Sequence, residues 1–319
     1  MYANTYLLIV TASIPFIAIY NGGAAVFRVM GNSRIPMRVA LVMNAVNVVG
    51  NAILIYGFHR GAEGVAIPTL VSRAVAAFLI MILLYQSKDR IQLEKTLRIH
   101  FDKSTVKKIL RIGVPNGMEN AMFQLGKIMV LSLVATFGTF AIAANAVSNV
   151  IALFEVLPGM AINLAITTVV ARCVGANDYV QARYYTKKLM AIIYASLLVV
   201  NIAIVLVLPI ILRAYNLSTE TAEVTRKIIY FHTACCVTIW PFSFSIPATL
   251  RAAGDARITM WVAIVSMWVC RIGFSYVLGK YMGLGVFGIW VAMVLDWCFR
   301  AIFLTIRYLR GKWKSMRVI

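Results

Sequence analysis

The sequence predicts an all-α, polytopic membrane protein built as a two-lobe helical bundle, on the basis of three observations. Of its 319 residues, 61% are hydrophobic and only 13% are charged, whereas soluble domains hold about 45–50% apolar and about 25% charged residues. Apolar runs of the roughly 20 residues needed to cross a bilayer recur along the chain. Lys and Arg are concentrated in alternate connections between these runs. Such a chain cannot cover itself with polar surface, so lipid must do so.

Nine segments are predicted to cross the membrane as helices. The fifth is long enough to tilt or to kink at Pro158–Gly159. In chain order the segments are 5–27, 39–56, 64–86, 113–136, 142–171, 189–212, 229–250, 258–279 and 285–309.

Basic residues set the predicted orientation. One set of alternate connections holds 22 of the 31 Lys and Arg residues, the other set holds 5, and four lie inside spans. The positive-inside rule makes the basic side cytoplasmic, which places the C-terminus in the cytoplasm of a cell-membrane protein and Met1 outside. The net charge of +20 therefore indicates topology and contact with anionic lipid headgroups rather than nucleic-acid binding.

One stretch of sequence occurs twice. Residues 28–50 and 251–273 lie 223 positions apart and are identical at ten of 23 positions, and farther on Gly64 falls opposite Gly288, one residue out of step. A long parallel repeat in an apolar chain is typical of a secondary transporter.

The repeat also predicts the domain boundaries. Residues 1–95 form the second half of an N-terminal lobe, 96–112 a cytoplasmic linker with an amphipathic helix on the membrane surface, and 113–319 a six-helix C-terminal lobe. The second copy begins near Lys107. A complete first copy is therefore expected to begin about 115 residues before Met1 and to add three helices.

Four stretches are similar to the multidrug and toxic compound extrusion (MATE) family. They are FRVMGNSRIPM (27–37), GVPNGMENAMFQLGK (113–127), GMAINLAITTVVARCVGANDYVQARYYTKK (159–188) and LRAAGDARITM (250–260). The resemblance covers the family's helices four to twelve. It implies alternating access, and export of cationic, amphipathic compounds in exchange for Na⁺ or H⁺. An aspartate that many prokaryotic members carry on helix one would precede Met1.

Glu119 heads the first candidate cation or substrate site. Lys127 follows it two helical turns later on the same face, and Gln124 lies nearby. A carboxylate inside a span is expensive and is a functional candidate by default. The alternative is an acid near the cytoplasmic interface that is held by Lys127 or by loop residues.

Glu155 is the second candidate, in the middle of its span and three residues before Pro158. Asn149 and Asn163 lie one to two turns to either side. A carboxylate with nearby amides and a proline-loosened backbone suits binding of a cation or cationic substrate. The alternative is a structural acid hydrogen-bonded between helices.

Other charged residues within spans are expected to be structural. Asp296 and Arg300, spaced i, i+4, predict an intrahelical ion pair, which Arg271 on the neighbouring span can join. Arg73 is expected to pair with an acid on the three further helices that the repeat predicts before Met1. His232 begins its predicted span and is interpreted as an interfacial structural residue, with a proton role as the lesser alternative.

No catalytic constellation is visible. The three histidines make no zinc set and no P-loop occurs, so neither an enzyme nor a cofactor is expected, and Na⁺ or H⁺ supplies the energy. The sequence predicts an antiporter for cationic amphipathic drugs. A flippase for lipid-linked precursors, a membrane-embedded enzyme and a non-transporting remnant are the alternatives, and a large hydrophobic groove with an Arg-rich cavity would favour the flippase.

Overall fold

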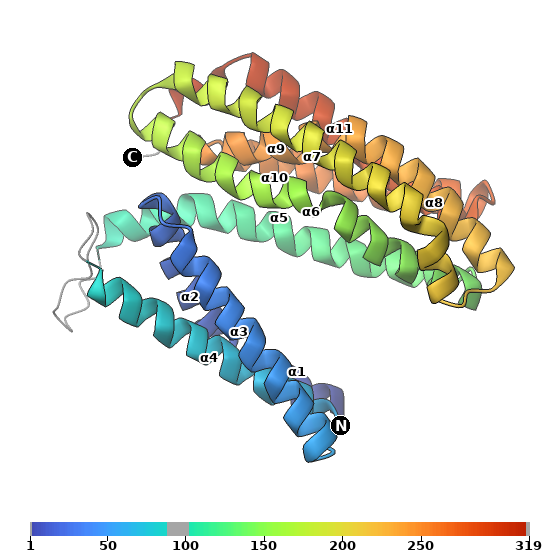
Figure 1. Cartoon of the computed structure of the whole chain (residues 1–319). Coiled ribbons are helices and arrows are strands. Elements are labelled where there is room, and N and C mark those ends of the chain that lie inside the picture. Colours follow the sequence, from blue (N-terminus) through green and yellow to red (C-terminus); the bar gives the residue numbers. More distant parts are fainter. Residues whose placement is uncertain (1, 88–101, 317–319) are drawn as a thin grey trace. The chain divides into compact units, whose positions relative to one another are not determined.

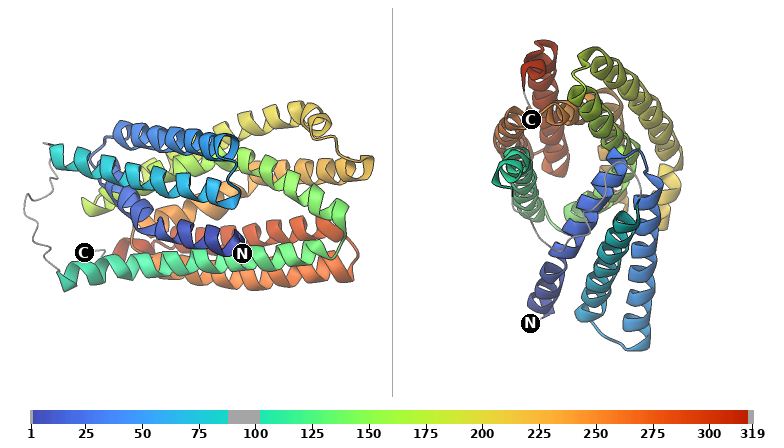
Figure 2. Two further views of the ribbon diagram at one scale, coloured as in Figure 1. Left: turned by 90° about the horizontal axis from the view of Figure 1, so that it is seen from below. Right: turned by 90° about the vertical axis from the view of Figure 1, so that its left-hand side faces the viewer.

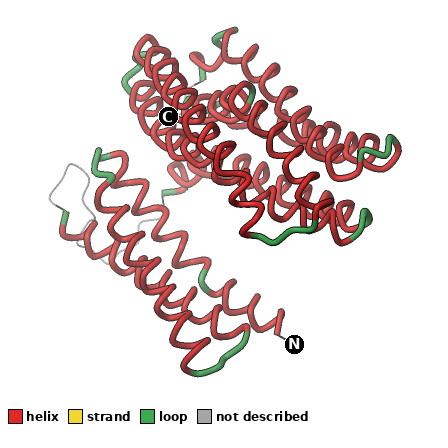
Figure 3. Tube along the Cα trace, turned by 45° about the vertical axis from the view of Figure 1, so that its right-hand side comes forward, coloured by secondary structure: helices red, strands yellow, loops and turns green. Residues whose placement is uncertain are grey.

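The computed structural model describes residues 2–87 and 102–316, and within these ranges every regular element is a helix (Figure 3). Two compact units divide the chain, residues 1–100 and 101–319. The all-helical architecture confirms the predicted fold class.

The first unit is a small bundle centred on α4. Its helices are α1 (Tyr2–Ala12), α2 (Ile14–Val29), α3 (Arg34–Ala52) with the π-helix η1 (Ile53–Gly57), and α4 (Ala62–Gln86). Helix α4 packs against the other three (Figure 1). Small residues on α4, such as Ala76, let large residues such as Phe27 and Ile80 fill the core. Arg73 donates to Ser13 Oγ at 2.6 Å, and the acid predicted as its partner lies outside this sequence.

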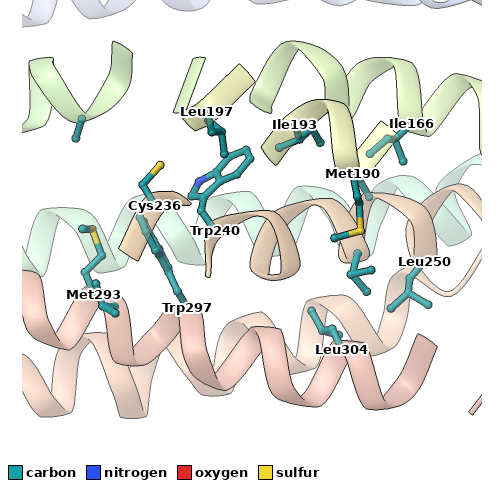
Figure 4. Close-up of a cluster of buried hydrophobic side chains, with 14 of the residues drawn as sticks. Ile166, Met190, Ile193, Leu197, Cys236, Trp240, Leu250, Met293, Trp297 and Leu304 are labelled. Atoms are coloured by element: carbon teal, nitrogen blue, oxygen red, sulfur yellow. The ribbon is translucent and has the colours of Figure 1, made fainter. Parts of the chain in front are cut away.

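The second unit is a larger bundle whose helices are roughly aligned with one another (Figure 2). Its core includes Trp240 and Trp297, which extend between helices toward apolar side chains such as Leu197 and Met293 (Figure 4). The elements are α5 (Lys103–Ala135), α6 (Thr139–Gly175), α7 (Tyr179–Ala214), α8 (Thr219–Thr238), α9 (Trp240–Ala252), α10 (Ala256–Ser266), η2 (Met267–Gly273), η3 (Ser275–Tyr281), α11 (Gly285–Leu309) and η4 (Lys312–Ser315).

Seven helical segments within the described ranges are long and apolar enough to cross a membrane, and the bent pair α8–α9 makes an eighth. Each of these eight coincides with a predicted span. The remaining predicted span, 113–136, lies within α5. Its apolar run is interrupted by polar residues, including Asn116, Glu119, Gln124 and Lys127.

Three helices, α5, α7 and α8, each begin ten residues earlier than the sequence analysis placed the corresponding span, α7 at Tyr179 rather than at residue 189. Of the predicted linker 96–112, residues 96–101 lie outside the described residues, and 103–112 form the first turns of α5, capped by Asp102. Helix α8 begins at Thr219, ten residues before the predicted span 229–250. Polar residues at its start lower the hydropathy without breaking the helix, so His232 lies well inside α8 rather than at its end.

The repeated stretches end their helices with the same turn. Gly31 and Gly254 both have φ of +88°, a left-handed conformation that glycine adopts without steric cost. The amide three residues past each helix end donates at 2.9 Å to a carbonyl five residues back, Asn32 to Phe27 and Asp255 to Leu250. This bond pattern is a Schellman cap.

The one-residue offset between the copies falls beside a π-helical segment. After the repeated turn, α3 stays α-helical through Ala52 before the short π-helix η1, whereas the second copy becomes π-helical earlier, at Met267, and over two longer segments, η2 and η3. A π turn holds one more residue than an α turn and is frequent at functional sites. Arg271, which aligns with Val48 of the first copy, lies in η2.

Candidate functional site

One cavity of the second unit, called the larger cavity below, has a volume of about 580 Å³ and lies among α5, α6, α9 and α11. Its wall is amphipathic, with aromatic rings beside amides and arginines. The lining side chains used below are Asn116, Glu119, Asn120, Phe123, Asn163, Thr167, Trp240, Phe244, Arg251 and Arg300.

Glu119 is paired with Arg251, the first residue after the predicted span 229–250, which agrees with the alternative of an acid held by a loop residue. Arg251 Nη1, at the end of α9, lies 3.1 Å and 3.2 Å from the two carboxylate oxygens. The predicted partner Lys127 makes no ion pair with Glu119 among the described contacts. Arg251 belongs to the repeated turn, so this turn contributes a charged group to the cavity wall.

A smaller cavity of about 210 Å³ lies among α5, α6, η2 and α11. Lys127 and Arg271 are its basic residues, and Asn149 lines it as well. Trp290 forms part of the wall, and its indole Nε1 donates to Asn145 Oδ1 at 3.2 Å.

Three cations surround the ring of Phe123, which lines the larger cavity. Lys127 Nζ lies 5.0 Å from the ring centroid, and the guanidinium carbons of Arg271 and Arg300 lie 5.3 Å and 5.4 Å from it. These distances are within the range of cation–π attraction. Phe123 therefore connects the basic residues of the two cavities.

Asp296 faces two of these cations. Its Oδ1 accepts from Arg300 Nε at 3.0 Å, and its Oδ2 lies 3.7 Å from Arg271 Nη1. The Ser266 hydroxyl also contacts Asp296 Oδ1. The structure thus brings together the three residues that the sequence analysis expected to meet.

Glu155 forms a second polar centre, buried in the core. The Glu155 carboxylate is fully inaccessible and its Oε2 contacts Nδ1 of His232, which is 2% exposed. Thr233 donates its hydroxyl to Oε1 at 2.7 Å. Both partners come from α8, 77 and 78 residues away in sequence. The prediction that His232 lies alone at the interface is therefore wrong, because α8 begins earlier than hydropathy indicated.

Aromatic rings separate this buried pair from the cavities. The His232 imidazole packs edge-on against Trp290 and Trp297, with centroid separations of 5.2 Å in both cases. Trp290 lines the smaller cavity, whereas Glu155 lines neither cavity. Trp290 thus contacts both the buried pair and the smaller cavity.

The sequence-predicted candidates are distributed over these places. Glu119 and Asn163 line the larger cavity, Lys127 and Asn149 line the smaller one, and Glu155 is in the core. Gln124 is exposed and lines neither. The sequence analysis missed Arg251 as a cavity residue, although its place in the repeat was a signal. Within the described residues, no group of three His, Cys, Asp or Glu side chains is arranged to hold a metal ion.

Known proteins resemble this chain over nearly all of its length. The MatE family model matches residues 115–277. An uncharacterized transporter of Bacillus subtilis, YisQ, is 27% identical over 298 residues, which cover 91% of this chain and 64% of YisQ. A probable multidrug resistance protein of Thermotoga maritima, NorM, is 26% identical over 327 residues, covering 99% of this chain and 68% of NorM.

The fold is shared with solved transporters. An outward-facing multidrug resistance transporter of the MATE family aligns over 98% of this chain and 70% of its own, with a TM-score of 0.86 and 23% identity. The chain spans about two thirds of the length of the curated relatives it matches.

Proposed function

The chain belongs to the MatE family, whose model matches half of its length, and on that premise we propose that it exports amphipathic organic compounds by ion-coupled alternating access. Its apolar helices make it a multi-pass membrane protein. The predicted cytoplasmic C-terminus is part of the proposal.

The contact between Glu155 and His232 is the observation that supports ion coupling. A carboxylate and an imidazole that share one proton are neutral together, which a low-dielectric interior tolerates best. Loss of that proton leaves a buried negative charge, which favours a conformation in which water or a new cation reaches the pair. The pair is thus suited to bind an ion in one conformation and release it in another.

We propose H⁺ as the coupling ion. The atoms around the site are two carboxylate oxygens, one hydroxyl oxygen and an imidazole nitrogen. Imidazole exchanges protons between pH 5 and 8, whereas hard metal cations take sets of oxygen ligands. The environment of Glu155 and His232 therefore suits a proton better than Na⁺.

Coupling in this proposal passes through shared helices rather than through competition for one site. Helix α6 holds Glu155 and also lines both cavities, and Pro158 lies between Glu155 and Asn163. Helix α8 holds His232, and its continuation α9 begins after a 45° bend. A change in the charge of the Glu155–His232 pair therefore acts on α6 and on α8–α9, and α6 and α9 form part of the cavity wall.

The cavity charges revise the expected substrate class. The sequence predicted cationic substrates because acids lie on cavity-facing helices, but Glu119 is paired with Arg251 and Asp296 with Arg300. The cavity arginines meet one of the two conditions for the alternative that was kept from the sequence, a flippase for lipid-linked precursors; a large hydrophobic groove is the other. The aromatic walls of the larger cavity favour compact organic molecules over lipid chains.

Transport by the purified protein in liposomes tests this proposal. Ethidium and naphthalene-1-sulfonate serve as cationic and anionic probes, and a pH gradient or a Na⁺ gradient is imposed separately. We expect the pH gradient to drive net movement of at least one probe and the Na⁺ gradient to drive none. If neither gradient moves either probe, the export proposal fails; if only Na⁺ drives movement, the assignment of H⁺ fails.

A further inference from the structure

We propose that the two cavities described above recognise an organic anion, namely an aromatic compound with a sulfonate, carboxylate or phosphate group. Lys127, Arg271 and Arg300, gathered around Phe123, would bind the anionic group. This inference names the substrate class of the transporter proposed above, so its role in export rests on that function, whereas anion binding can be measured independently.

The charges of the site do not balance within the described residues. Four basic side chains line the two cavities: Lys127, Arg251, Arg271 and Arg300. The carboxylates paired with them are Glu119 and Asp296, which leaves an excess of two positive charges. Unpaired charges within a membrane protein are costly, so an anion supplied by a ligand would be stabilised there.

Arg300 offers a donor that nothing in the described structure accepts. Its side chain is 6% exposed, and Nη2 has no hydrogen-bond partner although it is buried. An unmet guanidinium donor in a site is strongly unfavourable, and guanidinium binds carboxylate and phosphate oxygens through parallel bonds. Arg300 lines the larger cavity, so an anionic ligand there would lie beside a guanidinium that already has an unmet donor.

The internal repeat shows that these charges are additions to a shared scaffold. Arg271 aligns with Val48 of the first copy, and, with the one-residue offset, Arg300 aligns with Ala76 and Asp296 with Ser72. The helices and the glycine turns recur without these charged groups. Their presence is therefore not required by the repeated fold, which supports a role specific to this unit.

Aromatic rings indicate what the anionic group is attached to. Trp240 and Phe244 line the larger cavity and are stacked on each other with centroids 5.1 Å apart. Together with Phe123 they form an apolar wall beside the guanidinium of Arg300, which also lies 5.9 Å from the Phe244 centroid. A flat aromatic anion meets both features, because its ring packs on the wall while its charge faces the cations.

Binding to the purified protein in detergent tests the inference without requiring transport. Naphthalene-1-sulfonate and 1-naphthylmethylammonium share one ring system and differ in charge, and each can be followed by its effect on tryptophan fluorescence. We expect the sulfonate to bind at least tenfold more tightly. Lys127→Gln and Arg271→Gln should each weaken sulfonate binding about tenfold to a hundredfold, the range for loss of a charge-assisted contact.

Lys227→Gln is the matched control. Lys227 also lies over an aromatic ring, 4.5 Å from the Phe287 centroid, but lines neither cavity. Both test variants leave the Asp296–Arg300 pair intact. Thermal unfolding checks that they remain folded.

Three results would overturn the inference: no sulfonate binding, binding of the ammonium probe as tight as that of the sulfonate, or equal losses in the Lys227 variant and the test variants. Decyl phosphate tests a lipid-like anion, and we expect weaker binding because it lacks a ring; equal or tighter binding would refute the aromatic ligand class. The transport assay separates the two proposals. Export of ethidium without sulfonate binding would refute only the anion inference, and selective sulfonate binding without flux of either probe would refute only the transport function.

Discussion

Removal of His232 should destabilise the protein chiefly because it leaves Glu155 without its partner. In His232→Gln, a carboxylate with no accessible surface would keep the Thr233 hydroxyl, 2.7 Å away, as its described side-chain donor. Breaking a buried ion pair by removing one partner costs about 3–5 kcal/mol. In a Glu155→Gln background the same change removes only neutral contacts, with an expected cost of about 1 kcal/mol. The coupling free energy between the two residues should therefore be about 2–4 kcal/mol.

A double-mutant cycle measures this coupling. Unfolding free energies are determined for the parent protein, both single variants and the double variant in one detergent at pH 7. The Arg60–Glu63 pair is the control, because its side chains are 61% and 40% exposed and its coupling should stay below about 1 kcal/mol. If the Glu155–His232 coupling is no larger than that of the control, the buried pair does not exist as described and the reasoning is refuted.

The other predictions concern packing, backbone and pH. Gly159→Ala places a Cβ 2.3 Å from a ring carbon of Trp240, which is 3% exposed. This overpacking should lower the free energy of unfolding by about 1–3 kcal/mol. Unchanged stability would contradict the close approach of α6 and α9. Gly31→Ala, at φ of +88° with no atom within 4 Å of the new Cβ, should cost about 1–2 kcal/mol, and Gly31→Asn should cost less, by the same unfolding measurement. The Thr105 hydroxyl and the amides of the first turn of α5 lower the pKa of Asp102 below its ordinary value of 3.8. The Asp102 cap should therefore stabilise that turn fully above pH 3.8, and this stabilisation should be lost as the pH falls through the lowered pKa. Hydrogen exchange of the α5 amides can follow the loss. In Asp102→Asn the pH dependence should be absent.

Hydropathy and the repeat predicted much of the fold because both depend on local sequence. Runs of apolar residues located the membrane-crossing helices, and the two copies of the repeat adopt the same glycine turn at Gly31 and Gly254. Helix ends were less accurate where polar residues continue a helix. The early start of α8 at Thr219 is the clearest case, and it led to the wrong placement of His232.

The partners in the site could not be read from sequence because they join residues far apart in the chain. Glu155 meets His232, and Glu119 meets Arg251 across 132 positions. Only the Asp296–Arg300 pair, which lies within one helical turn, follows from spacing. The net charge of a cavity wall depends on which of its charged side chains are paired with residues far away in the sequence. For that reason the sequence suggested a cation site, whereas the assembled contacts leave an excess of basic groups.

Gradient-driven transport by Glu155→Gln tests the central claim of ion coupling most directly. In liposomes, the account predicts that this variant still exchanges labelled for unlabelled probe across the membrane, but that a pH gradient no longer drives probe accumulation. Glu63→Gln, which removes an exposed carboxylate from the Arg60 pair, should respond to the gradient as the parent protein does. Undiminished gradient-driven accumulation by Glu155→Gln would contradict the assignment of Glu155 as the coupling residue.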